Sequence, residues 1–371
     1  MVQLTTILKL LSLFSGIGAF EKALTNLQID YDLVGFSEID KFAIKSYCEI
    51  HDVPKEKNLG DVNKINCSTL PKDIDLITYG FPCQDISMAG KKEGFVKENG
   101  SLTRSGLFFE ALRIIKETKP KIAIAENVKA LTNKKFTNEF ATVLSSLEEA
   151  GYVNYWKVLN AKDYSIPQNR ERVFIVSIRK QTNKKLEFPQ TMPLQKCLKD
   201  MLDESVDDKY YLSSKMINYL FNTTKRNSFS YTKTDIYEIS KAITAMEGRR
   251  SISNYIQEIM QIGQMYPNSG NPQAGRIYAV NGISPSICTC QGGNCMPKVV
   301  EIDGVLMRIR KLTPNECWRL MGFSDEDFVK AGEVNSDAQL YKQAGNSIVV
   351  NVLMEIFKQL EKINLLERRK F

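Results

Sequence analysis

Residues 7–18, Ile-Leu-Lys-Leu-Leu-Ser-Leu-Phe-Ser-Gly-Ile-Gly, decide the fold class of this chain. The apolar run over residues 7–14 predicts a buried β-strand, and Ser15-Gly16-Ile17-Gly18 predicts a tight turn in which the backbone can approach a ligand closely. The next residues predict a helix with an apolar face of Phe20, Ala23, Leu24 and Leu27. Because strand and helix patterns alternate up to about residue 180, we expect an α/β fold with a mostly parallel sheet.

The same patterns predict the remaining elements. We expect strands at residues 7–14, 32–36, 58–61, 74–79, 122–125, 152–159 and 172–178. We expect helices from about residue 40, around residues 107–115, and over residues 138–149 and 346–366. After about Arg179 the chain is polar, glycine-rich and irregular to about residue 300, which indicates a second, smaller domain.

The composition is typical of a globular protein, and no apolar run predicts a membrane span or an N-terminal signal peptide. The 371 residues suffice for two domains, and the net charge of +7 suggests a polyanionic partner. Eight scattered cysteines are no disulfide framework, so we expect a reducing cytosol. Cys288, Cys290 and Cys295 lack a fourth ligand nearby in the sequence, and we expect no metal site.

The single histidine, His51, limits the chemistry that the chain can perform. It falls near the end of an expected helix, where we expect a surface residue rather than a catalyst. Catalytic triads, cysteine–histidine pairs and multi-histidine metal sites are therefore excluded or strained. A cysteine nucleophile would have to take its partners from other residue types.

The candidate nucleophile is Cys83 in Gly80-Phe81-Pro82-Cys83-Gln84, directly after the strand expected at residues 74–79. Open α/β sheets keep their chemistry at this end of their strands. The alternative is a small buried hydrophobic residue, which is what most free cysteines are. Glu126 follows the next expected strand and would lie near Cys83 if the two strands are neighbours. The alternative for Glu126 is a carboxylate that caps the following segment.

Arg170 and Arg172 stand two apart at the start of an expected strand, so we expect both on the same face. Such a pair suits a phosphate or a carbonyl oxygen. The alternative is a surface ion pair through Glu171, which is common.

A nucleotide-type ligand is indicated by Gly16 and Gly18 together with two carboxylates. Glu38 ends the second expected strand, where an acidic group holds ribose hydroxyls, and Asp61 is placed to reach an adenine amino group. Position 21 carries Glu21 instead of the third glycine of the dinucleotide motif, and its charge would repel a pyrophosphate. An adenosyl ligand without phosphates therefore fits better than NAD, and an NAD-dependent oxidoreductase is disfavoured.

Taken together, these residues resemble the DNA (cytosine-5) methyltransferase family, of the bacterial or phage restriction-modification type. The similar motifs follow the family's order over residues 11 to about 355, except for residues 180–270, where family members differ most. Ser12 departs from the family, many of whose members carry an acidic residue there. The motifs that carry the resemblance are Leu13-Phe14-Ser15-Gly16-Ile17-Gly18, Glu38-Ile39-Asp40, Gly60-Asp61-Val62, Gly80-Phe81-Pro82-Cys83-Gln84, Glu126-Asn127-Val128, Gln168-Asn169-Arg170-Glu171-Arg172, Arg310-Lys311-Leu312-Thr313-Pro314-Asn315-Glu316-Cys317 and Gln343-Ala344-Gly345-Asn346-Ser347.

The resemblance implies an enzyme that transfers a methyl group from S-adenosylmethionine to carbon 5 of a flipped-out cytosine, in a specific double-stranded DNA sequence, through a covalent Cys83 adduct. It implies a Rossmann-like catalytic domain at residues 1–182 and 340–371 and a target-recognition domain at residues 183–339. The alternatives are a transfer-RNA cytosine-5 methyltransferase of the same fold and a non-catalytic DNA-binding regulator. We expect a cytoplasmic, nucleoid-associated monomer in a bacterial cytosol, with a cognate restriction endonuclease, if one exists, acting separately.

The resemblance also assigns roles to single residues. The catalytic residues that it implies are Cys83, Glu126, Arg170 and Arg172. The cofactor-binding residues that it implies are Phe14, Gly16, Ile17, Gly18, Glu38, Ile39, Asp61, Val62, Pro82, Leu107, Asn346 and Ser347. The expected DNA-binding residues are Gln84, Ser87, Lys91, Lys92, Arg249, Arg250 and Arg276.

Overall fold

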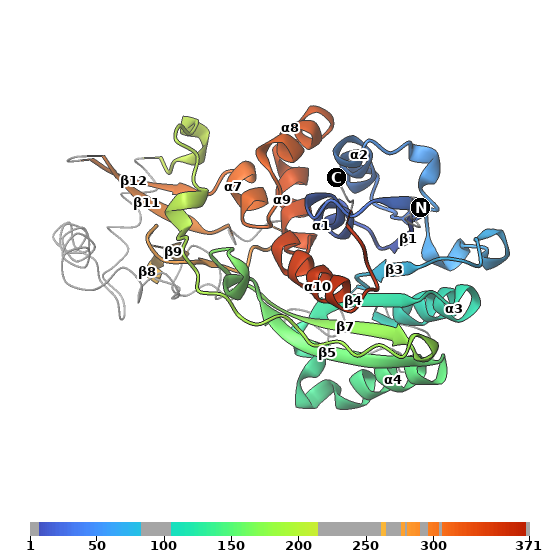
Figure 1. Ribbon diagram of the computed structural model, residues 1–371. Coiled ribbons are helices and arrows are strands. Elements are labelled where there is room, and N and C mark those ends of the chain that lie inside the picture. The colour runs from blue at the N-terminus through green and yellow to red at the C-terminus, as the bar shows by residue number, and fades with distance from the viewer. Residues whose placement is uncertain are drawn as a thin grey trace.

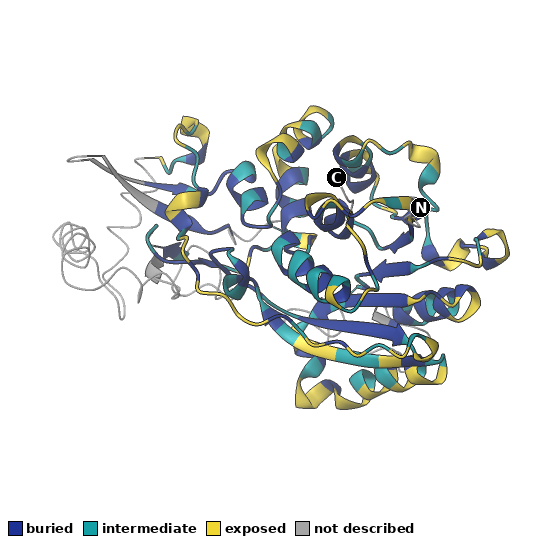
Figure 2. Ribbon diagram, viewed as in Figure 1, coloured by how far each residue is buried: buried dark blue, intermediate teal, exposed yellow. Residues whose placement is uncertain are grey.

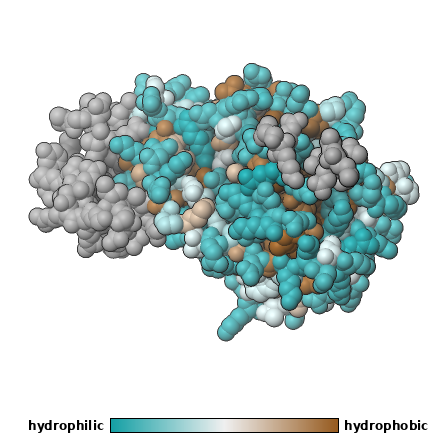
Figure 3. Space-filling view, in the orientation of Figure 1, coloured by the Kyte–Doolittle hydropathy of each residue, from teal (hydrophilic) through white to brown (hydrophobic). Residues whose placement is uncertain are grey.

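A computed structural model describes residues 7–82, 105–213, 261–264, 276–278, 280–289, 296–303 and 306–368 of the chain. It has a larger body around one sheet and a smaller part, on the left of Figure 1, that carries the strands of a second sheet. Figure 3 shows a mostly hydrophilic surface with hydrophobic residues in patches. Among the helices of the described ranges, none is both long enough and apolar enough to cross a membrane.

The central sheet has six strands in the order β2-β1-β3-β4-β7-β5. Neighbouring strands from β2 to β4 are parallel, whereas β7 runs antiparallel to both β4 and β5. The mostly parallel α/β sheet expected from the alternating patterns is thereby confirmed. The strands are β1 (Leu8–Leu13), β2 (Tyr31–Ser37), β3 (Leu76–Tyr79), β4 (Ile122–Val128), β5 (Tyr152–Asn160) and β7 (Glu171–Arg179).

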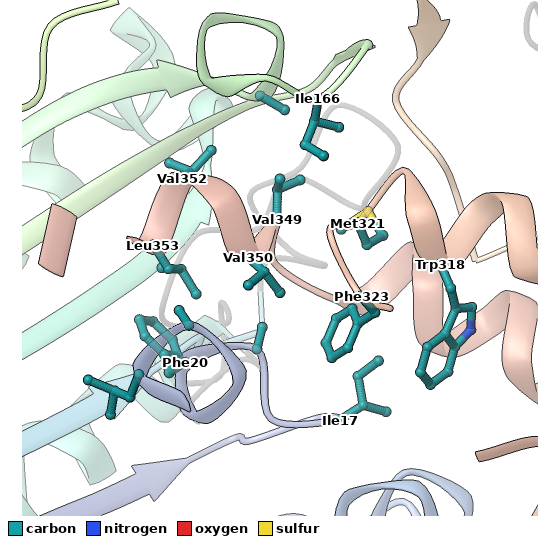
Figure 4. Close-up of a cluster of buried hydrophobic side chains, with 14 of the residues drawn as sticks. Ile17, Phe20, Ile166, Trp318, Met321, Phe323, Val349, Val350, Val352 and Leu353 are labelled. Atoms are coloured by element: carbon teal, nitrogen blue, oxygen red, sulfur yellow. The ribbon is translucent and has the colours of Figure 1, made fainter. Parts of the chain in front are cut away.

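Helices cover both faces of this sheet, because successive strand residues point to opposite sides. Leu10 and Ile124 pack in one core cluster with α1 (Ala19–Asn26), α2 (Lys41–His51) and α10 (Val350–Lys362). Their sequence neighbours Leu11 and Ala123 belong to a second cluster, with α3 (Phe108–Thr118) and α4 (Thr137–Glu149). Figure 2 shows β3, β4 and β7 as largely buried and the edge strand β5 as partly exposed, and Figure 4 shows Phe20 of α1 close to Leu353 of α10.

Three expectations about single elements were wrong. Residues 58–61 form no strand but a single bridge from Asn58 to Phe36, since Gly60 has a left-handed φ of 70° that a strand does not accommodate. Strand β4 continues to Val128, because β7 pairs with it as far as Arg172. The helix expected over residues 346–366 is shorter and begins only at Val350, because the backbone is extended at Ser347 (ψ 165°) and Val349 (ψ 115°).

The smaller part is more regular than its composition indicated. Its described strands form a four-stranded sheet in the order β12-β11-β9-β8, and a separate two-stranded pair joins β10 to β6 in parallel. The pair connects Ser284 of this part directly to Gln168, just before strand β7 of the main sheet. These strands are β6 (Gln168–Asn169), β8 (Gln261–Gln264), β9 (Arg276–Tyr278), β10 (Ser284–Pro285), β11 (Lys298–Asp303) and β12 (Leu306–Lys311).

Helices α7 (Pro314–Arg319), α8 (Asp325–Val334) and α9 (Asp337–Asn346) complete the helical elements. Residues 313–339, which we expected in the recognition domain, contact the catalytic body: Lys22 of α1 lies 2.7 Å from Asp327, and Asn335 donates to the carbonyl of Phe42. We therefore propose to move the domain boundary from residue 339 to about residue 312. The short 3₁₀ helices are Lys55–Lys57, Val62–Lys64, Cys67–Thr69, Ser105–Leu107, Lys129–Thr132, Lys134–Phe136, Ala161–Tyr164, Lys180–Thr182, Leu198–Met201 and Asp208–Tyr210.

Candidate active site

The loop after β1 has an unusual backbone. Phe14, Gly16 and Gly18 have left-handed φ values of 52°, 57° and 79°. Phenylalanine rarely adopts this conformation, and such backbone strain concentrates at functional sites. The turn directs the N–H of Gly16 to Oε2 of Glu38 at 2.9 Å, so the two carboxyl strand ends of β1 and β2 are joined.

Glu38 follows the last residue of β2 and connects several backbone segments by hydrogen bonds. Its carboxylate accepts three backbone hydrogen bonds, from Gly16, Ile39 and Asp40. Burial raises the pKa of Glu38, and these N–H groups oppose that rise by favouring the charged form. Asn58 joins this residue to the next loop, since its Oδ1 accepts from the N–H of Glu38 and of Gly60.

The 61–67 segment is held from the other face of the sheet. Arg113 of α3 donates to the carbonyls of Val62 and Ile65 at 3.2 and 3.1 Å. Both hydrogen bonds from Asn63 to Asp61 end on Oδ1 of that carboxylate. These bonds lower the pKa of Asp61, which is therefore a charged acceptor.

These residues suit an adenosyl group. Glu38 and Asp61 are acceptors for hydroxyl and amino donors, and the Ile39 side chain beside them is 76% exposed, an apolar surface for a ring. The expectation that Glu21 would meet a ligand was wrong: Glu21 is 1% exposed and accepts a hydrogen bond from the hydroxyl of Tyr47. The case against NAD therefore depends on the missing third glycine alone.

Glu126 lies at the carboxyl end of β4 and is paired with Arg172 of β7, with 3.0 Å between Oε1 and Nε. The N-cap of the following 3₁₀ helix is Val128, so the interpretation of Glu126 as a cap was wrong. Burial raises the pKa of the Glu126 carboxyl, against the opposing charges of Arg172 and Arg170. A carboxyl in this state can hold a proton and donate it.

The segment after β3 lies against Glu126. A Cβ on Gly80 would be 3.7 Å from Oε2 of Glu126 and 3.7 Å from Ile348, so only a small residue leaves this side of the carboxyl open. Asn127 fixes the next residue by donating to the carbonyl of Phe81 at 3.0 Å. Cys83 follows Pro82 directly, and it lies outside the described residues.

The spacing predicted Arg170 and Arg172 on the same face, but in the structure the two side chains reach different partners. Arg172 reaches Glu126, whereas Arg170, 4% exposed, donates to Ser286 and to the carbonyls of Ile287, Gly345 and Ser347. The separation arises because Arg170 lies in the connection between β6 and β7, and only Arg172 lies within β7. The alternative, a surface ion pair of the arginines through Glu171, was wrong, because Glu171 pairs with Lys129 at 2.8 Å.

Comparison with known proteins identifies the family. A family model described as C-5 cytosine-specific DNA methylase matches residues 8–362. The chain belongs to this family. It is a DNA (cytosine-5) methyltransferase, as the motifs predicted.

Curated relatives cover nearly all of the methylase. It is 35% identical to the orphan methyltransferase M.SPRI of Bacillus phage SPR, over 95% of this chain and 97% of that protein. It is 32% identical to the type II methyltransferase M.HhaI of Haemophilus parahaemolyticus, over 94% and 93%. The solved structure of the Dnmt2 methyltransferase of S. pombe has the same fold, with a TM-score of 0.63 at 19% identity, over 96% of this chain and 99% of that one.

The other cofactor-binding and DNA-binding residues predicted for the methylase lie in several different elements. Ile17 and Val62 are buried, Leu107 precedes α3, Asn346 ends α9, and Ser347 gives its carbonyl to Arg170. Arg276 lies on β9 of the smaller sheet. The expected DNA-binding residues outside the described residues are Gln84, Ser87, Lys91, Lys92, Arg249 and Arg250.

Four residues that hold the site were not singled out from the sequence: Asn58, Arg113, Asn127 and Gln168. Gln168 is fully buried and joins three segments, donating to the carbonyl of Leu320 and accepting from the N–H of Ile287. Asn127 and Gln168 belong to motifs that were recognised, and their amides were the available signal. Asn58 and Arg113 act only through contacts that the fold creates.

Proposed function

We propose that this methylase uses S-adenosylmethionine to methylate carbon 5 of a flipped-out cytosine in a specific double-stranded DNA sequence, through a covalent adduct at Cys83. The observation that carries the proposal is the Glu126–Arg172 pair beside Gly80. It places a protonatable carboxyl against Gly80, at the carboxyl end of the strands of an α/β sheet. Gly80 stands three residues before the proposed nucleophile Cys83 in the sequence.

Glu126 has the properties needed to bind and activate the base. Carbon 5 of cytosine is a poor nucleophile, and protonation or hydrogen bonding at ring nitrogen 3 makes carbon 6 easier to attack. A carboxyl whose pKa is raised by burial is suited to donate that proton. The Arg172 guanidinium holds the carboxyl in one orientation and is itself available to a base carbonyl oxygen.

Cys83 is proposed as the nucleophile. Its thiolate adds to carbon 6, which moves the ring electrons to carbon 5; carbon 5 then takes the methyl group, and loss of its proton restores the 5,6 double bond and expels the thiolate. The cationic groups of Arg170 and Arg172 favour a thiolate nearby. A base within a duplex cannot reach such a site, so it must leave the stack.

The residues at the ends of β1 and β2 are proposed to hold the methyl donor, which supplies an electrophilic methyl group when bound. Glu38 would accept from the ribose hydroxyls, Asp61 from the adenine amino group, and Ile39 would cover the ring. The glycine turn lets the backbone approach the ligand. The absence of a third glycine favours this ligand over a dinucleotide.

Duplex DNA is the substrate that the family indicates. We propose that the smaller part reads the target sequence, with Arg276 among its DNA contacts. Our proposal includes a monomer in the bacterial cytosol, associated with the nucleoid, and leaves any cognate restriction endonuclease as a separate protein.

Duplex DNA that contains 5-fluorocytosine tests the proposal, because fluorine at carbon 5 blocks the final elimination and traps the adduct. We expect a denaturation-resistant protein–DNA complex that requires S-adenosylmethionine. Cys83→Ser should abolish it, and Cys48→Ser, on helix α2, should leave it unchanged.

Two results would contradict the proposal. One is the lack of an adduct on random-sequence duplex DNA. The other is an adduct that persists undiminished in Cys83→Ser. Transfer RNA that contains 5-fluorocytosine serves as a parallel substrate, and trapping there alone would establish the RNA alternative.

A further inference from the structure

The only histidine of the chain, expected as a surface residue rather than a catalyst, is partly exposed and packs against the cofactor loop. His51 is the last residue of α2, and its Nε2 lies 3.0 Å from the carbonyl oxygen of Ile17. A carbonyl oxygen can only accept, so Nε2 carries the proton and donates it. The imidazole thus holds the Ser15–Gly18 turn through the carbonyl oxygen of Ile17.

The contact with the next residue is closer still. A Cβ on Gly18 would be 2.1 Å from Nε2 and 2.7 Å from Cδ2 of His51. Any side chain there would displace the imidazole, and the left-handed φ of 79° also requires glycine. The ring therefore packs directly on the Gly18 backbone, at the start of α1.

The imidazole is supported from behind by buried aromatic residues. Its ring centroid is 4.8 Å from that of Tyr47, which is fully buried and stacks on Phe36 at 4.0 Å. The Tyr47 hydroxyl is fixed by its hydrogen bond to Glu21. The Ile17 side chain is anchored as well, since it is 2% exposed and lies near Phe323 in the core (Figure 4).

We propose that His51 is a positioning residue of the cofactor site, which holds the Ser15–Gly18 turn in the conformation that joins Gly16 to Glu38. The inference rests on the proposed function, since it concerns the same ligand. His51 touches neither the proposed ligand nor the reacting atoms and acts through the backbone of the turn.

Burial keeps His51 in the neutral form at neutral pH. Burial lowers its pKa to about 4, with Lys22 of α1 acting in the same direction and Asp327 of α8 against it. A folded pKa below the ordinary value means that the neutral form is complete above about pH 6.5 and gives way to the charged form only as the pH falls toward 4. Both forms keep the Nε2–H that donates to Ile17. The contact therefore persists at neutral pH.

Nuclear magnetic resonance of the full chain without a histidine tag observes this residue alone, because the sequence has one histidine. We expect the imidazole in the Nε2–H tautomer, neutral at pH 6, with signals that shift when S-adenosylhomocysteine binds. An imidazole that titrates near pH 6.5 and ignores the ligand would overturn the inference even if every variant failed to fold.

Two variants separate the hydrogen bond from the ring. His51→Phe keeps a ring without the donor, and His51→Gln keeps a side-chain N–H at similar reach. Calorimetry with S-adenosylhomocysteine should give about tenfold weaker binding for His51→Phe, the loss of one hydrogen bond of roughly average strength. His51→Gln should recover most of it, and Cys48→Ser, one turn earlier on α2, should bind like the wild type.

Steady-state kinetics should show the same effect in the KM for the methyl donor, with kcat within about twofold. Wild-type affinity in His51→Phe would overturn the inference and leave the proposed function intact. Failure of the wild type to bind S-adenosylhomocysteine would instead overturn the proposed function, and the inference with it.

Discussion

The two sides of the site are held by contacts between residues that differ in their separation along the sequence. On the cofactor side (residues 14–18, 38 and 58–62), hydrogen-bond partners are 1 to 51 residues apart, from Glu38 and Ile39 to Val62 and Arg113. On the base side (residues 126, 170, 172 and 345–347), Arg170 joins partners 116 to 177 residues away. The residues of the cofactor side thus all come from the first 62 residues of the chain, whereas the base side is assembled from three distant segments.

The difference predicts two kinds of failure. Damage to the cofactor side should weaken ligand binding and leave the rest of the protein folded. Damage to the base side should reduce either the chemical step or the stability of the whole assembly, because the same contacts connect the smaller part to the main sheet. Three substitutions test this contrast, beginning with the largest expected effect.

Glu126→Gln should reduce kcat by about 100- to 10,000-fold, the usual contribution of a general acid or base, because the amide cannot supply the proton. Binding of S-adenosylhomocysteine should not change, since Glu126 is on the base side. Glu171→Gln is the matched control, because that exposed carboxylate pairs with Lys129 on the surface. Single-turnover methylation assays measure the rates, and equal rates for Glu126→Gln and the wild type would remove Glu126 from the mechanism.

Gly345→Ala should lower the free energy of unfolding by about 3 kcal/mol, as overpacking does at a rigid contact. The added Cβ would lie 2.3 Å from the backbone carbon of Cys288 and 2.4 Å from the nitrogen of Thr289, and backbone atoms cannot move aside cheaply. Gly332→Ala is the control, because Gly332 is an exposed position of helix α8 with space for a Cβ. It should be neutral or stabilising by up to about 1 kcal/mol.

Urea denaturation measures both changes. A Gly345→Ala protein as stable as Gly332→Ala would show that the 286–289 segment yields easily. In that case, the base side would not be the rigid assembly described above.

Asn58→Ala should weaken S-adenosylhomocysteine binding about tenfold, a free-energy change of about 1.4 kcal/mol. The substitution removes the acceptor shared by Glu38 and Gly60 and so loosens the cofactor side only. Asn133→Ala is the control, since that exposed residue precedes the 3₁₀ helix Lys134–Phe136 and its side chain makes no capping hydrogen bond. Calorimetry gives both affinities; a large loss of stability in Asn58→Ala without a change in affinity would contradict the contrast between the two sides.

The site was predictable to the extent that it depends on short motifs. Glu38 was placed correctly because it ends a strand and follows a glycine turn, and Glu126 because it follows an apolar strand pattern. The expected end of β4 at residue 125 was wrong because pairing with β7 extends that strand to Val128. The orientation of Glu21 and the strand expected at residues 58–61 were wrong because burial and a left-handed glycine overrode local pattern.

The sequence by itself determined the alternation of strands and helices up to about residue 180, the glycine turn and the family, because each depends on residues that are neighbours in the chain. Only the tertiary structure decided that Arg170 and Arg172 turn to different partners and that His51 supports the cofactor loop. The same holds for Gly345, which must be small because Cys288 passes against it. These features depend on which distant segments pack together, and hydrophobic periodicity, a local signal, does not specify that.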